Sequence, residues 1–222
     1  MEMLDIEDLA EEVMSGLPGV DSMQAEDKLH EAAIEFFRTT ALWKHEMPWI
    51  NTYAGEPNYR LNYPLSSQPE RIQVARFKVE DGANPYLLHP RSELELEREY
   101  GGEWESIVGT PRRYLHIDDP EVVRLVPIPD LDLTASLFIR LQVIPARNAK
   151  ELPAILTNKY WQAIAAGAKM KLTSMKDQPW SDPDAARKAE VKFNDGKARG
   201  INDRAQGHTG HTQKMMAEYP LA

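Results

Sequence analysis

Three close pairs of polar residues have types and spacings that could support chemistry. His208 and His211 lie three residues apart, so on a helix both rings could bind one metal ion. No further ligand follows in this stretch, and we interpret it as a solvated segment. Asp118-Asp119 could hold a cation, but the proline that follows makes the motif typical of a turn. Arg112-Arg113 could contact phosphate, although a water-facing pair at the start of a strand explains it better.

The familiar catalytic and nucleotide-binding motifs are absent from the sequence. There is no Walker loop, no Gly-x-Gly-x-x-Gly, no Gly-x-Ser-x-Gly and no His-Glu-x-x-His. Because none of the 222 residues is cysteine, disulfides, thiolate zinc sites and cysteine nucleophiles are excluded. The isolated His30 and His116 are interpreted as structural, and core packing is the expected role of the tryptophans. We therefore expect no enzymatic activity, no cofactor and no metal, and interpret the chain as an assembly or binding protein.

Charge is distributed unevenly along the chain. The formal net charge is −9, but residues 1–35 contain eleven acidic residues and one basic residue, whereas residues 147–222 contain thirteen basic and eight acidic residues. Segments of opposite sign can attract each other, a neighbouring copy or another partner. We expect an acidic and a basic face to meet between subunits. The acidic face is Glu26, Asp27, Glu31 and Glu35, and the basic face is Lys188, Lys192, Lys197 and Arg199.

Both ends of the chain show the apolar period of helices, and these would position the charged faces. Residues 5–15 predict a short helix, and residues 26–43 predict a longer one with Asp21 or Ser22 as its N-cap. The apolar stripe of the longer helix is Leu29, Ala32, Ala33, Phe36, Phe37, Thr40 and Trp43. Residues 152–172 predict a third helix, whose small residues 163–167 would pack against Ala32 and Ala33. Asp182-Pro183 predicts the start of a fourth.

The middle of the chain shows the alternation of half-buried strands. Tyr59, Leu61 and Tyr63 alternate with polar residues, as do apolar residues between 137 and 143. The turn signals Asp81-Gly82 and Asn84-Pro85 predict a hairpin over residues 71–89 with its tip at Asp81, Gly82 and Asn84. Ser92 and Glu95 form a capping box that predicts a short helix.

Together these patterns predict an α+β fold. It would be a discontinuous bundle of about four helices, residues 1–46 and 151–205, with an inserted antiparallel β unit at residues 47–150 that contains one short helix. Residues 206–222 show no period and are expected to form an extended tail. The sequence contains no run of about 18 apolar residues, so no membrane span is predicted.

The order of several short motifs resembles that of tailed-phage head-to-tail adaptor proteins, similar to tail tubular protein A of short-tailed phages. The resemblance begins with Leu17-Pro18-Gly19, residues 32–36 (AAIEF), Thr39 or Thr40, and Trp43. It continues with Gly109-Thr110-Pro111, Tyr114 and residues 125–129 (LVPIP). It ends with Leu152-Pro153, residues 163–168 (AIAAGA), Trp180, Ala185 and Phe193. These motifs span most of residues 17–196. Lys169 and Lys171 depart from the pattern, because an apolar continuation is expected there.

The resemblance implies a structural virion protein at the head–tail junction that assembles in the host cytoplasm. A ring of copies, usually twelve, would bind the portal protein, lengthen the DNA channel and provide the docking surface for a tail nozzle or tail tube protein. Genomic DNA would pass through without sequence-specific binding, and no membrane is involved. It also implies that the hairpin tip faces the tail and that the C-terminal segment reaches the portal. That segment's candidate contacts are Met215, Met216, Tyr219 and Leu221.

A nucleic-acid-binding accessory protein is the alternative from a different class. Its footprint would be the basic C-terminal third: Lys169, Lys171, Lys188, Lys192, Lys197, Arg199 and Arg204. The overall acidity argues against tight nonspecific binding, which requires a basic footprint. An enzyme would need a pocket with perturbed titratable groups, which sequence does not reveal.

Overall fold

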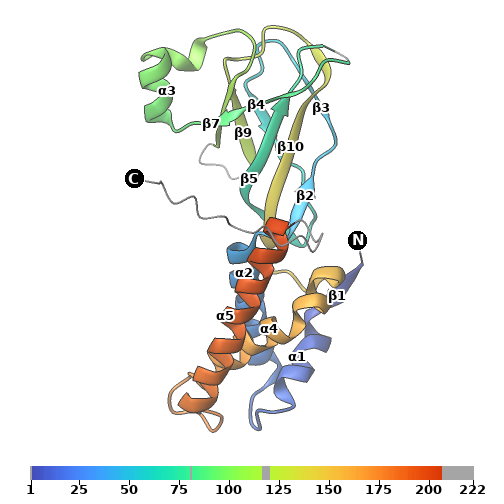
Figure 1. Cartoon of the computed structure of the whole chain (residues 1–222), viewed down its shortest axis with the longest axis vertical. Helices are drawn as coiled ribbons and strands as arrows, with labels where there is room; N and C mark the ends of the chain where they lie inside the picture. The colour runs from blue at the N-terminus through green and yellow to red at the C-terminus, as the bar shows by residue number, and fades with distance from the viewer. Residues whose placement is uncertain (1, 81, 117–120, 207–222) are drawn as a thin grey trace, which may run out of the picture. The chain divides into compact units, whose positions relative to one another are not determined.

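The structure is a computed structural model that describes residues 2–80, 82–116 and 121–206. The chain divides into two compact units. The helical unit combines Met1–Leu42 with Lys150–Ala222, and the β unit is Trp43–Ala149. In Figure 1 the helical unit therefore takes its colours from both ends of the scale, blue and orange to red.

The predicted arrangement of about four bundled helices with one inserted antiparallel β unit is wrong. The fold is α+β, but the described residues form five α-helices and three sheets built from eleven strands. One of these sheets lies in the helical unit. Sequence reasoning underestimated the sheet content because several strands have only two or three residues, too few to display alternation. The predicted extended tail lies outside the described residues from residue 207 onward.

Four helices form most of the helical unit. They are α1 (Ile6–Met14), α2 (Ser22–Thr40), α4 (Ala154–Thr173) and α5 (Pro183–Gln206). The predicted start signals of α2 and α5 are confirmed, whereas α4 begins at Ala154, two residues later than predicted. The Asp21 carboxylate accepts a hydrogen bond from the Gln24 amide at 2.8 Å, and the Asp182 carboxylate accepts from the amides of Asp184 and Ala185, each at 3.0 Å. Figure 1 shows α4 running alongside α5.

Small residues let α2, α4 and α5 approach closely. A Cβ placed on Gly167 of α4 would lie 3.0 Å from the Cβ of Ala32 and 2.8 Å from the Phe193 ring. A Cβ on Gly196 of α5 would lie only 2.1 Å from the Cβ of Ala163. The expected contact between Ala32 and the small residues of α4 is confirmed. The buried α2 stripe of Leu29, Ala32, Ala33, Phe36, Phe37 and Thr40 is confirmed as well.

The long helix ends earlier than its sequence pattern indicates. Ala41 adopts a left-handed conformation with φ of 52°, and its amide bonds to the carbonyl of Phe37 at 3.0 Å. Trp43 therefore lies beyond α2, in the β unit, where its carbonyl accepts a hydrogen bond from the Val143 amide. Trp43 fits the apolar spacing of α2, but it is buried as part of the β unit and not as part of the helix.

A two-stranded sheet in the helical unit was not predicted. β1 (Met3–Asp5) pairs antiparallel with β11 (Glu151–Pro153), with Leu4 opposite Leu152. The strands lead directly into α1 and α4. The sheet therefore fixes the starts of both helices relative to each other.

The β unit contains two further sheets. One has the order β2-β10-β5-β6, with β3 also paired to β10, and all its pairs are antiparallel. Its strands are β2 (Lys44–Glu46), β3 (Ile50–Thr52), β5 (Ser67–Phe77), β6 (Tyr86–Leu87) and β10 (Leu133–Pro145). β5 and β6 pair through Arg76–Leu87 and Phe77–Tyr86, which confirms the two arms of the predicted hairpin.

The other sheet has the order β4-β9-β8-β7 and includes one parallel pair, β7 with β8. Its strands are β4 (Asn58–Arg60), β7 (His89–Pro90), β8 (Arg113–His116) and β9 (Val122–Val126). The predicted capping box is present at Ser92 and Glu95 and opens α3 (Glu93–Tyr100). Leu96 of α3 is buried in a small apolar cluster with Trp104, Leu115 and Val126.

Candidate functional site

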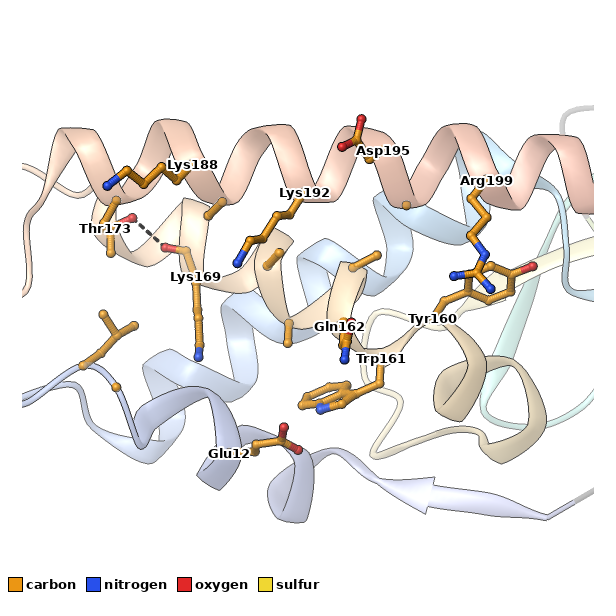
Figure 2. Close-up of a pocket in the computed structure, with 18 of the residues that line it drawn as sticks. Glu12, Tyr160, Trp161, Gln162, Lys169, Thr173, Lys188, Lys192, Asp195 and Arg199 are labelled. Carbon is orange, nitrogen blue, oxygen red and sulfur yellow. Dashed lines mark hydrogen bonds between the residues drawn. The ribbon is translucent and has the colours of Figure 1, made fainter.

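An open groove in the helical unit is the leading candidate for a functional site. It lies over α4 between α1 and α5 and has a volume of about 1110 Å³. Figure 2 shows Glu12 on the α1 side, Lys188, Lys192 and Arg199 on the α5 side, and Lys169 and Trp161 projecting from α4 between them. Five alanines line the groove: Ala163, Ala165, Ala166, Ala185 and Ala189. Their small side chains leave the space that forms it.

Positive charge dominates the groove. Lys169, Lys188, Lys192 and Arg199 line it, and none of them forms an ion pair with a carboxylate in the described part of the chain. Lys188 and Lys192 are also like charges four residues apart on α5, a spacing that costs a few tenths of a kcal/mol. The carboxylate of Asp195 points away from the other labelled side chains in Figure 2. The groove is therefore suited to an anionic partner.

A hydrogen-bonded triad holds one end of the groove. The Tyr160 hydroxyl donates to Asp203 at 2.6 Å, and the ammonium of Lys159 lies 2.9 Å from the same carboxylate oxygen. Burial, followed by the hydrogen bond to Asp203, raises the pKa of Tyr160, while the hydrogen bonds from Tyr160 and Lys159 lower the pKa of Asp203. Both shifts favour a neutral phenol beside a carboxylate anion. The triad fixes the C-terminal turns of α5 against α4.

The acidic face predicted on α2 is already occupied within the chain. Glu35 accepts a hydrogen bond from Lys197 at 2.9 Å and lies 3.1 Å from Lys171, and Glu31 lies 2.6 Å from Lys28. Asp27 also pairs with Lys28, and Glu26 accepts from the Ser22 hydroxyl. Lys197, predicted as part of the basic face, therefore joins Glu35 of the same chain. Lys188, Lys192 and Arg199 remain on the groove.

The Glu35 cluster should make stability depend on pH. Partial burial would raise the pKa of Glu35, but hydrogen bonds and charge from Lys197 and Lys171 outweigh it, and the pKa lies below its ordinary value. This stabilisation is present above the unfolded-state pKa and is lost as pH falls through the lower folded-state pKa. Because the side chain is 38% exposed, we expect a contribution of at most about 1 kcal/mol after allowance for solvent screening.

We expect Glu35→Gln to be less stable than the wild type at pH 7, with the difference shrinking as pH falls below about 4.5. Urea unfolding at several pH values measures this dependence. Glu190→Gln is the control, because Glu190 is exposed and has no ion pair in the described residues. A difference between wild type and Glu35→Gln that stays constant down to pH 3 would contradict the assignment.

The other residues singled out from sequence are placed as follows. Arg113 pairs with Glu99 at 2.8 Å, and the Arg112 guanidinium lies 4.7 Å from the centre of the Tyr86 ring, so both are engaged within the β unit. Gly82 has φ of 80°, which suits a turn, and Asn84 is exposed. Several candidates lie outside the described residues: Asp81, Asp118, Asp119, His208, His211, Met215, Met216, Tyr219 and Leu221.

Sequence reasoning missed two parts of the groove. Trp161 was treated only as a packing residue, and the acids of α1 were counted only in the charge of residues 1–35. Glu7, Asp8, Glu11 and Glu12 are all exposed, and none has an ion pair in the described part of the chain. The unpaired acids of α1 could be identified by matching each charged residue with a partner of opposite charge. That match requires knowledge of which helices pack together, and the sequence does not show it.

The described residues contain no group of three or more histidines, cysteines or carboxylates placed to hold a metal ion. Among them, no helix is long and apolar enough to span a membrane. No protein-family model matches the chain, and no curated protein matches it either.

Proposed function

We propose that this chain is a structural head-to-tail adaptor of a tailed phage. It would form a ring, usually of twelve copies, below the portal, lengthen the DNA channel and provide the docking surface for a tail nozzle or tube. The proposal rests on the order of motifs that resemble this family. It assigns no catalytic role to any residue.

The observation that supports it is that motifs far apart in the sequence are in contact in the structure. Gly19 packs on Trp180, with 3.5 Å from a Cβ at Gly19 to the indole ring, and Gly167 touches both Ala32 and Phe193. In the β unit, the amide of Gly109 bonds to the carbonyl of Ile128 at 2.8 Å. These residues of the resemblance thus take part in packing or hydrogen bonding within their own unit.

Portal rings of the same virus provide the test. Mixing them with the purified chain should give a complex in which a ring of copies is added to one end of the portal, visible by electron microscopy and by the mass from sedimentation. Absence of binding at every salt concentration would contradict the adaptor function.

Removal of the residues after Gly207 should weaken portal attachment by about tenfold or more, since the lost contacts include apolar anchors. Unfolding should be unchanged, because the last described helix, α5, ends at Gln206 and is left intact. Co-sedimentation with portal rings measures attachment, and circular dichroism measures folding. Alanine substitution of Met215, Met216, Tyr219 and Leu221 in the full-length chain separates side-chain contacts from tail length. Normal attachment of the truncated chain would refute this role for the tail.

The basic groove also favours a second function, nucleic-acid binding. Two of the seven expected cations, Lys171 and Lys197, are paired with Glu35, and this reduces the free positive charge. A steep fall of DNA affinity with rising salt would support this function. No binding at low salt would exclude it.

A further inference from the structure

Among the described residues of the helical unit, ion pairing leaves one acidic and one basic surface without partners. On α2, Asp27, Glu31 and Glu35 pair with Lys28, Lys171 and Lys197, and Glu26 accepts a hydrogen bond from the Ser22 hydroxyl. The carboxylates of α1 are not paired in the described residues, and neither are Lys169, Lys188, Lys192 and Arg199 of the groove, whereas Lys159 pairs with Asp203. The two unpaired surfaces are opposite in sign.

We propose that the groove of one copy binds the acidic outer face of α1 from a second copy. Glu7, Asp8 and Glu11 of the second copy would face Lys169, Lys188 and Lys192, and Glu12 belongs to the groove of its own chain. This deepens the proposed function, since it names the contact by which copies of the adaptor join into a ring.

The dimensions agree with this contact. The groove cations on α5 run from Lys188 to Arg199, which is about 16 Å of helix, whereas the nine residues of α1 extend about 14 Å. The alanines that line the groove allow another helix to come close to α4. Ile6, Ala10 and Val13 are buried within their own unit, so α1 can offer its charged side without leaving its place.

The contact joins two different surfaces and is therefore head-to-tail. Each copy would bind one neighbour with its groove and the other neighbour with the outer face of its α1. Addition of copies would therefore continue until a ring closes. Opposite charges would favour the correct orientation, because a groove meeting a groove or α1 meeting α1 is repulsive.

Disulfide trapping tests the contact directly, because the chain has no cysteine of its own. Glu11→Cys and Lys192→Cys variants, mixed at high concentration and low ionic strength, should form a linked dimer. One chain carrying both substitutions should form a ladder of oligomers. Glu11→Cys mixed with Lys176→Cys is the matched control, since Lys176 is exposed and does not line the groove. Equal yields in both mixtures, or no dimer in either, would overturn the proposal.

Charge reversal provides the second measurement. Glu7→Lys/Glu11→Lys and Lys188→Glu/Lys192→Glu should each weaken self-association by about tenfold, and mixing the two variants should restore heterodimers. Circular dichroism checks that each variant is folded. Unchanged self-association in both variants would overturn the contact. A Lys188→Glu/Lys192→Glu variant that loses binding of single-stranded DNA but keeps its self-association would also overturn it and would favour a nucleic-acid groove.

These outcomes are separable from the portal test. A ring that forms on the portal without the Glu11–Lys192 cross-link leaves the adaptor function intact and overturns this contact. Head-to-tail cross-linking without portal binding supports the contact and contradicts the adaptor function.

Discussion

Replacing Phe36 with alanine is expected to lower the free energy of unfolding of the helical unit by about 3–5 kcal/mol. The ring is fully buried and lies between helices, with ring centres 5.6 Å from Phe37, 5.2 Å from Tyr160 and 6.5 Å from Phe193. Its removal leaves a cavity that the neighbouring rings cannot fill without moving their helices. Urea unfolding followed by far-ultraviolet circular dichroism measures the loss.

Val191→Ala on α5 is the matched control. Its side chain is 60% exposed, so the change should stay within about 0.5 kcal/mol. A loss below about 1 kcal/mol for Phe36→Ala would mean that Phe36 is not central to the core of the helical unit.

Gly196→Ala is expected to destabilise the helical unit by about 1–3 kcal/mol, although alanine favours a helix over glycine by about 1 kcal/mol. The new methyl group would lie 2.1 Å from the Cβ of Ala163, a contact that no rotamer change can relieve because neither side chain has a rotatable Cβ substituent. α4 and α5 would have to separate. Thermal and urea unfolding measure the effect.

A compensating change distinguishes crowding from other causes. Adding Ala163→Gly to Gly196→Ala restores the missing space, so the double variant should be more stable than Gly196→Ala alone despite a glycine in α4. Gly102→Ala places its methyl group in open space and should have little effect. If the double variant were the less stable one, crowding at Ala163 would not be the cause.

Sequence predicted the helical parts well because their signals are local. The stripe from Leu29 to Thr40 and the caps at Asp21, Asp182 and Ser92 depend on residues within one or two turns. The sheet β1–β11 joins segments almost 150 residues apart through three residues each, and no local pattern reports such a pairing. The end of α2 was misplaced because Ala41, an excellent helix former, takes a left-handed conformation there.

The candidate site was predictable only in part. The basic residues Lys188, Lys192 and Arg199 were identified from charge alone, and they line the groove. Their expected partner on α2 was not available, because Glu35 faces Lys171 and Lys197 across the helical unit. Which opposite charges meet depends on helix packing, so the free acids of α1 emerged only from the structure.

The chain order has a consequence for synthesis on the ribosome. Residues 43–149 form a compact unit of their own, whereas α2 requires α4 and α5, which are translated more than 100 residues later. During translation the apolar stripe of α2 stays exposed until α4 and α5 have been synthesised. The intervening residues 43–149 form a loop that has to close before the stripe is buried. Early folding of the β unit would shorten the effective length of this loop. The helical unit, which contains the first residues to be synthesised, would then be the last to finish folding.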